Sequence, residues 1–162
     1  MLSVRCICQS SRHGYILLET LVAVLIFSLA AFALVPSYRN WQKEKELEMA
    51  AEEVAAAIRQ VEVQAKSDID AGLLPASGLY FICETKADGN VKYHTRYGVE
   101  NINPKGSLPD GICLEAGNVT MRFRKDTFAG TGETYNVALK TKDGKYRRIV
   151  TVAMYTGRVR IK

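Results

Sequence analysis

The 162-residue sequence lacks most of the features that mark a specialised class of protein. Four cysteines are too few for a disulfide-dense miniprotein, and a single long apolar run excludes a membrane protein with several spans. No internal or collagen-like repeat is present. Hydrophobic residues make up 48% and charged residues 24%, which excludes a disordered tail. A chain of this length and composition forms about one globular domain.

Residue types that carry out catalysis are also scarce. There are two histidines, and His13 lies in the short segment before the apolar run. His94 lies in an alternating segment between Tyr93 and Tyr97, without an acid and a nucleophile arranged around it. No phosphate-binding glycine loop and no metal-ligand spacing occurs. We therefore expect a protein that is not an enzyme and that holds no metal or cofactor.

The apolar run covers residues 16–35 and contains one charged residue, Glu19. Twenty helical residues span about 30 Å, the thickness of the hydrocarbon core of a bilayer. A buried core helix is the alternative, but apolar runs of that kind are usually shorter. We expect a membrane-spanning helix. A short basic segment that ends at Gly14 precedes it, whereas a secretory signal has its cleavage site after the apolar core.

Glu19 is the unusual residue in this run, because a carboxylate at the bilayer centre costs about 2.5–3.5 kcal/mol. Two interpretations remain open on physical grounds. If the chain is cut after Gly14, the new amino group of Tyr15 in one subunit can be neutralised by Glu19 of a neighbouring, staggered subunit. Alternatively, Glu19 lies close to the headgroups and needs no partner.

The string GYILLE followed by TLVAVLIFSLAAFALVP closely resembles the N-terminus of type IV pilins and type II secretion pseudopilins. This resemblance implies cleavage by a prepilin peptidase after Gly14 and N-methylation of Tyr15. It also implies that Glu19 guides assembly and that Pro36 kinks the helix. The family usually has phenylalanine where this chain has Tyr15, which keeps the aromatic ring.

The resemblance further implies where the protein is found and what it contacts. The expected partners are the prepilin peptidase, other pilin or pseudopilin subunits, the inner-membrane assembly platform and the membrane itself. The subunit would cross the inner (cytoplasmic) membrane once, with its globular domain outside the cytoplasm. It would then enter a pilus or a pseudopilus.

A second helical segment follows Pro36 and ends near Gly72. Apolar residues form one stripe along it at steps of three and four: Leu47, Ala51, Val54, Ile58, Val61, Ala65 and Ile69. A coiled coil is possible, but the stripe is short and rich in alanine. We expect it to pack on the chain's own globular domain, and its charged face to be solvated: Lys43, Glu44, Glu48, Glu52, Glu53, Arg59 and Glu62.

From residue 78 onward the hydrophobic period changes from that of a helix to that of strands. Strands are expected within residues 78–85, 91–98, 118–125, 134–140, 146–154 and 155–162. Residues 87–90 and 142–145 form tight turns, and residues 98–111 and 126–134 form long loops. The predicted fold is α+β, with a long N-terminal helix packed on an antiparallel β-sheet or β-sandwich, the type IV pilin fold. Its parts are a leader (1–14), an assembly helix (15–36), an amphipathic outer half (37–71) and a β domain (72–162).

The cysteines leave two alternatives open. Cys6 and Cys8 lie in the leader and would leave with it. Cys83 and Cys113 remain, and a disulfide between them would close a loop of about 30 residues, worth about 3–4 kcal/mol. The alternative is two buried free thiols, which are common in protein cores.

The net charge of +5 is unevenly distributed. Residues 15–119 carry 9 Lys and Arg against 14 Asp and Glu, whereas residues 120–162 carry 11 against 3. Strand alternation places Arg122 and Arg124 on one face, and Arg158, Arg160 and Lys162 on one face. If these strands share a sheet, five cations line its outer surface, with Arg147 or Arg148 nearby.

This surface has two interpretations. It is either the ordinary solvated face of an antiparallel sheet or a site for the phosphates of DNA. Tyr146, Tyr155 and Phe128 would add base stacking. The ending VAMYTGRVRI resembles the last strand of pseudopilin H/FimT-like minor pilins, some of which bind DNA in natural transformation through a Gly-Arg-x-Arg motif. Gly157, Arg158 and Arg160 fit that motif.

Overall fold

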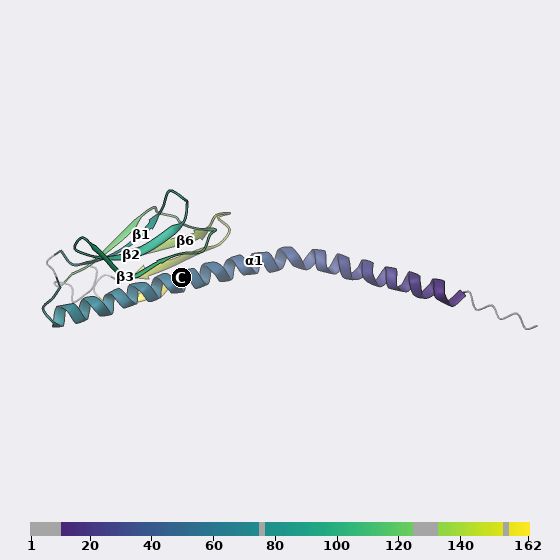
Figure 1. Ribbon diagram of the computed structural model, residues 1–162, viewed down its shortest axis with the longest axis horizontal. Coiled ribbons are helices and arrows are strands. Elements are labelled where there is room, and N and C mark those ends of the chain that lie inside the picture. The colour runs from purple at the N-terminus through teal and green to yellow at the C-terminus, as the bar shows by residue number, and fades with distance from the viewer. Residues whose placement is uncertain (1–10, 75–76, 125–132, 154–155) are drawn as a thin grey trace, which may run out of the picture. The chain divides into compact units, whose positions relative to one another are not determined.

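The computed structural model describes residues 11–74, 77–124, 133–153 and 156–162, with side chains from Tyr15 onward, Ala33 excepted. One helix, α1 (Ser11–Asp70), precedes eight strands, β1 to β8 (Figure 1). The chain divides into two compact units, Met1–Gln42 and Lys43–Lys162, and α1 contributes to both. The N-terminal apolar helix and the antiparallel sheets confirm the predicted α+β class.

The strands of the second unit form two antiparallel sheets of four strands each. The first sheet has the order β3-β2-β1-β5, and the second has the order β4-β6-β7-β8. Their bounds are Leu79–Thr85 (β1), Val91–Tyr97 (β2), Glu100–Ser107 (β3), Ile112–Leu114 (β4), Val119–Phe123 (β5), Tyr135–Thr141 (β6), Arg147–Val152 (β7) and Val159–Ile161 (β8).

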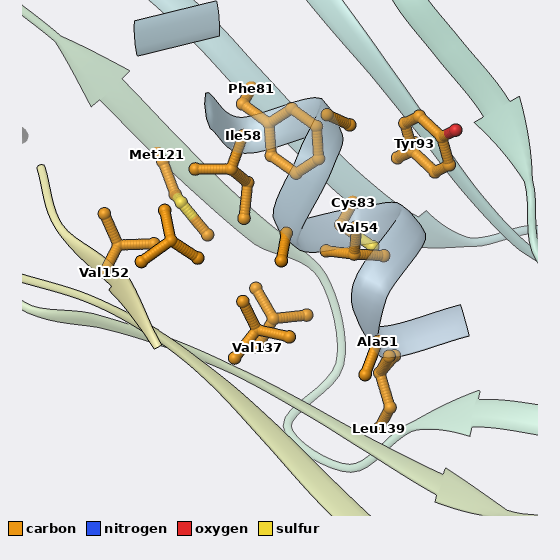
Figure 2. Close-up of a cluster of buried hydrophobic side chains, with 14 of the residues drawn as sticks. Ala51, Val54, Ile58, Phe81, Cys83, Tyr93, Met121, Val137, Leu139 and Val152 are labelled. Atoms are coloured by element: carbon orange, nitrogen blue, oxygen red, sulfur yellow. The ribbon is translucent and has the colours of Figure 1, made fainter. Parts of the chain in front are cut away.

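The apolar stripe of α1 packs in the core of the second unit, as predicted. Six of its seven members are fully buried and Ile69 is partly buried. In Figure 2, Ala51, Val54 and Ile58 lie between side chains of the two sheets, among them Phe81 and Val137. The stripe therefore contacts its own domain, and the described helix ends at Asp70, one residue before the predicted end.

Part of the helix face that was expected to be solvated is in contact with the sheets. Lys43 forms an ion pair of 2.7 Å with Asp143, and Glu44 one of 3.1 Å with Arg148. The hydroxyl of Tyr93 donates a hydrogen bond of 2.7 Å to Glu53. These contacts add polar links between α1 and both sheets. The face is nevertheless largely solvated, as predicted, because Lys43, Glu52, Glu53 and Arg59 are exposed.

The expected long loop at residues 98–111 is also wrong, because it contains strand β3 (Figure 1). Pro104 argued against a strand, since proline cannot donate a ladder hydrogen bond. β3 is an edge strand, where proline is tolerated. The register also shifts opposite Pro104, where Thr95 Oγ1 donates to its carbonyl at 3.0 Å.

Both predicted hairpin turns are present. Residues 86–90 connect β1 to β2 with Gly89 at φ 80°, and residues 142–146 connect β6 to β7 with Gly144 at φ 69°. Positive φ is the conformation for which these turns require glycine. The second predicted loop, at residues 126–134, lies mostly outside the described residues.

Candidate functional site

The first candidate site is the apolar helix of the unit Met1–Gln42. All side chains of residues 15–32 and 34–39 are exposed. Large apolar groups are among them: 84% of Phe32, 76% of Phe27 and 68% of Leu17 are accessible. A soluble domain does not leave so long an apolar segment uncovered on all sides. This segment is long and apolar enough to cross a membrane, as the sequence predicts.

The residues expected to take part in processing and assembly lie on this helix. Gly14 is within α1, Tyr15 is 74% exposed, and Glu19 follows one turn later, also exposed. Pro36 lies inside α1 and has no N–H to donate to the carbonyl of Phe32. The kink, the cleavage and the methylation stay predictions.

Polar side chains within the apolar run differ in how their hydrogen-bonding groups are used. Thr20 Oγ1 donates to the carbonyl of Leu17 at 2.9 Å, and Ser28 Oγ donates to that of Leu25 at 2.8 Å. Both hydroxyls are therefore satisfied within the helix. Glu19 has no hydrogen bond or ion pair to any residue that the structure describes. Its carboxylate needs water, headgroups or another subunit.

The second candidate site is the basic surface, and the structure corrects its predicted composition. Arg122 lies on β5 of the first sheet, whereas Arg160 lies on β8 of the second sheet. The five predicted cations therefore do not share one sheet. The alternation itself is confirmed, because Met121 and Phe123 are buried on β5 and Val159 is buried on β8.

Arg122 is engaged within the first sheet. Its Nε donates to the carbonyl of Ser77 at 2.6 Å, and its guanidinium lies 5.7 Å from the ring centre of Tyr80. Arg96, across β1, lies 5.3 Å from the same ring. These contacts give Arg122 a structural role, and neighbouring Arg124 is exposed just after β5.

The outer face of the second sheet gathers a different set of cations. Strand register pairs Lys140 with Arg147 and Thr151 with Arg160, while Ile149 exchanges backbone hydrogen bonds with Lys162. These positions alternate with the buried valines and leucine of β6, β7 and β8, so they share the outward face. We call this set the basic face: Lys140, Arg147, Arg158, Arg160 and Lys162.

The members of the basic face differ in their partners. Arg147 Nε lies 2.6 Å from Glu115, which reduces its availability. Arg158, Arg160 and Lys162 are exposed, and their side chains have no carboxylate partner among the residues that the structure describes. Arg148 belongs to the opposite face, where it contacts Glu44. Sequence reasoning missed Lys140, although Val137 and Leu139 alternate with it in β6.

The remaining residues predicted for the DNA site are Gly157 and the aromatic residues expected to stack on bases. Gly157 has φ 65°, and a Cβ built on it would lie 2.7 Å from the carboxylate of Glu62. Tyr146 packs partly against the core, with Lys145 Nζ 5.5 Å from its ring centre, so its ring is not free for stacking. Phe128 and Tyr155 lie outside the described residues.

Cys83 and Cys113 are free thiols in the structure, as in the second alternative, but only Cys83 is buried and Cys113 is partly exposed. Cys83 is buried on β1 of the first sheet. Cys113 lies on β4 of the second sheet, on the face opposite buried Ile112 and Leu114, with its thiol 3.6 Å from the carbonyl of Lys140. The thiols of Cys83 and Cys113 therefore belong to different sheets and differ in burial. Burial, with a smaller effect of Glu84, raises the pKa of Cys83 to about 12.

His94 lies on β2 between Ile82 and Lys105 on the neighbouring strands. Among the described residues, no group of three or more His, Cys, Asp or Glu side chains is placed to hold a metal ion. No family model, curated protein or solved structure matches this chain. The family resemblance therefore depends on the motifs of the sequence alone.

Proposed function

We propose that this chain is a minor pilin or pseudopilin, a noncatalytic subunit of a type IV pilus or a type II secretion pseudopilus. The observation that carries the proposal is the string from Gly14 to Glu19 at the start of a helix whose apolar side chains are all exposed through residue 32. A membrane first covers this surface, and neighbouring subunits cover it after assembly. The packing of the later part of α1 against antiparallel sheets supports the type IV pilin fold.

In this function each processing residue has a defined role. The prepilin peptidase cuts after Gly14 and methylates the amino group of Tyr15. Glu19 then neutralises the N-terminus of a neighbouring subunit as the subunit leaves the assembly platform. Opposite charges close together in a low-dielectric surrounding attract strongly, which selects the correct stagger. The globular domain stays outside the cytoplasm throughout.

The test is co-expression of the full chain with a prepilin peptidase, followed by mass analysis of the N-terminus. The wild type should lose 14 residues, and Gly14→Val should stay uncut and out of filaments. Tyr15→Phe is the matched control and should be processed normally, because it keeps the ring. Glu19→Gln should be cut but fail to assemble. Normal assembly of the Gly14 variant would show that the proposal is wrong.

A second candidate function is DNA binding by the same subunit in natural transformation. Arg158, Arg160 and Lys162 of the basic face favour it, because they are exposed and have no carboxylate partner among the described residues, and because they include the arginines of the Gly-Arg-x-Arg string. Cations in a row on one strand suit a run of backbone phosphates. This function adds to filament assembly and does not replace it.

A further inference from the structure

The aromatic residues of the unit Met1–Gln42 are sorted along α1 by their polarity. Those with a polar group on the ring are at the two ends of the apolar run: Tyr15 before it, and Tyr38 and Trp41 after it. The two phenylalanines, Phe27 and Phe32, lie inside the run. Tyrosine and tryptophan concentrate at membrane–water interfaces because one end of the ring is apolar and the other forms hydrogen bonds, whereas phenylalanine lacks that group.

Tyr38 and Trp41 form one exposed aromatic surface. Their ring centres are 5.9 Å apart with 31° between the planes, and the two residues are 58% and 54% exposed. Arg39, also exposed, lies between them in the sequence. A long cationic side chain next to such rings can reach lipid phosphates while its methylenes stay in the apolar layer.

The rise of about 1.5 Å per helical residue gives the distances between these residues along the membrane normal. Tyr15 and Trp41 are separated by about 39 Å along α1, close to the 40–45 Å of a bilayer with its headgroups. Phe27 lies near the middle of that span. Glu19 and Trp41 are separated by about 33 Å, slightly more than the hydrocarbon core.

We propose that Tyr38, Arg39 and Trp41 form an anchor that binds the headgroup layer of a phospholipid bilayer and fixes the depth of the helix. This inference rests on the membrane-inserted stage of the proposed function. With the anchor at one interface, Glu19 lies at the opposite edge of the hydrocarbon core. Its carboxylate is then solvated by water and headgroups in a single subunit.

This placement decides between the two interpretations of Glu19 for the unassembled subunit. The hydroxyls of Thr20 and Ser28 are already bonded within the helix, so Glu19 is the remaining side chain in the run that needs external solvation. At the membrane edge it obtains that solvation without a partner. A neighbouring amine becomes necessary only when assembly removes the helix from the lipid.

The chain offers a direct probe of the anchor, because Trp41 is its one tryptophan. The full, uncut chain is reconstituted into vesicles of phosphatidylethanolamine and phosphatidylglycerol. These vesicles also contain phosphatidylcholine brominated either near the carbonyl or near the methyl end of the acyl chain. Trp41 fluorescence should be quenched more strongly by bromine near the carbonyl. Stronger quenching by the deep bromine, or no quenching with emission typical of water, would overturn the anchor.

A relocated tryptophan separates failure of the anchor from failure of insertion. In Trp41→Phe/Phe27→Trp, the probe should be quenched most strongly by bromine near the methyl end. If this variant is quenched deeply while native Trp41 is not quenched, the helix is inserted but the anchor is wrong. If neither is quenched, the membrane-inserted stage of the proposed function fails as well.

The role of the anchor residues is tested with Trp41 as reporter. Tyr38→Leu/Arg39→Leu should move the strongest quenching of Trp41 toward the deeper bromine, because the helix is free to slide inward. Phe32→Leu is the control inside the apolar run and should leave the depth unchanged. An unchanged depth in the double variant would overturn the role of these two residues.

The depth of Glu19 has its own pair of variants. Glu19→Gln should leave insertion and the Trp41 depth unchanged, because the carboxylate already lies at the membrane edge. Leu29→Glu, which places a carboxylate near the middle of the span between Glu19 and Trp41, should reduce the fraction of chain inserted. If Glu19→Gln changes the Trp41 depth or raises the fraction of chain inserted, Glu19 does not lie at the edge.

Discussion

The backbone of Gly157 lies directly against the carboxylate of Glu62, so that a Cβ at residue 157 would be 2.7 Å from Glu62 Cδ. The Glu62 side chain is 13% exposed and is held by an ion pair of 2.6 Å with Lys66. Gly157 also has φ 65° and donates its N–H to the carbonyl of Ala153 at 3.0 Å. The backbone conformation at this position therefore favours glycine, and a larger residue would also have to displace the end of the Glu62 side chain.

Gly157→Ala should destabilise the fragment Lys43–Lys162, which contains every buried core residue that the structure describes. The left-handed backbone alone costs an alanine about 1–2 kcal/mol, and the contact with Glu62 adds to this. Gly89→Ala is the control, because it shares a positive φ but meets open space. Urea unfolding should show a larger loss for Gly157→Ala, and Glu62→Ala should recover part of it. Equal losses for the two glycine variants would show that the contact with Glu62 is unimportant.

The packing of one face of α1 against residues of both sheets predicts a strong contrast between its two faces. Ile58→Ala should cost about 2–5 kcal/mol in the free energy of unfolding, because its side chain is fully buried among residues of both sheets. Val63→Ala removes a side chain that is 67% exposed and should change stability by less than about 0.5 kcal/mol. Similar losses for both would contradict the position of the helix in the core.

The helix could be predicted from the sequence because its apolar period is long and regular. Leu47 to Ala65 recur at steps of three and four, and all of them are buried. Strand β3 could not be predicted in this way. Its asparagines, glycine and Pro104 are typical of a loop, and only the edge position and the register shift beside Thr95 make it a strand.

The candidate sites were also predictable only where they depend on a local pattern in the sequence. Alternation correctly assigned Arg158, Arg160 and Lys162 to one outward face, because it is a local property of a strand. It could not tell that β5 and β8 belong to different sheets, since pairing depends on contacts distant in the sequence. The same limit applies to Glu62, whose contact with Gly157 crosses 95 positions.

The two free cysteines should differ in their reaction with a thiol reagent. In the folded fragment Lys43–Lys162, Cys113 is partly exposed and should be labelled by iodoacetamide, whereas Cys83 is buried and should react only after unfolding. Reactivity requires both access and thiolate, and burial denies both to Cys83. Peptide mass analysis identifies the labelled residue. Resistance of both cysteines after unfolding, relieved by a reductant, would indicate a disulfide instead.

Burial of Cys83 should also make stability fall in alkaline solution. Its pKa is raised from 9.0 to about 12 in the folded protein, so the unfolded chain releases the proton first as the pH rises. The free energy of unfolding should therefore decline between pH 9 and about 12, by about 1.4 kcal/mol per pH unit from this group.

Cys83→Ala serves as the control for this slope. It should be less stable near neutral pH because of the cavity, but should lose less stability on going to high pH. Urea unfolding at several pH values measures both effects. Burial, with a smaller effect of Glu53, also raises the pKa of Tyr93, so Tyr93→Phe should flatten the slope above pH 10. Parallel slopes for the wild type and Cys83→Ala would contradict the assignment to Cys83.

The basic face predicts salt-sensitive binding of duplex DNA by the fragment Lys43–Lys162. Arg158→Ala/Arg160→Ala removes two exposed cations that have no carboxylate partner among the described residues. Each phosphate contact contributes about 0.9 to the slope of log K against log salt, so this variant should lower the magnitude of the slope by about 2.

The control variant Lys86→Ala/Lys92→Ala removes the same formal charge elsewhere, from lysines that pair with Glu84 and Asp88. Its slope should stay close to that of the wild type, because lysines already paired with carboxylates neutralise fewer DNA phosphates and so displace fewer counterions from the DNA. Fluorescence anisotropy over a range of salt concentrations measures both slopes. Equal slopes for the two variants would assign the binding to overall charge, and no binding at low salt would remove this function while leaving filament assembly untouched.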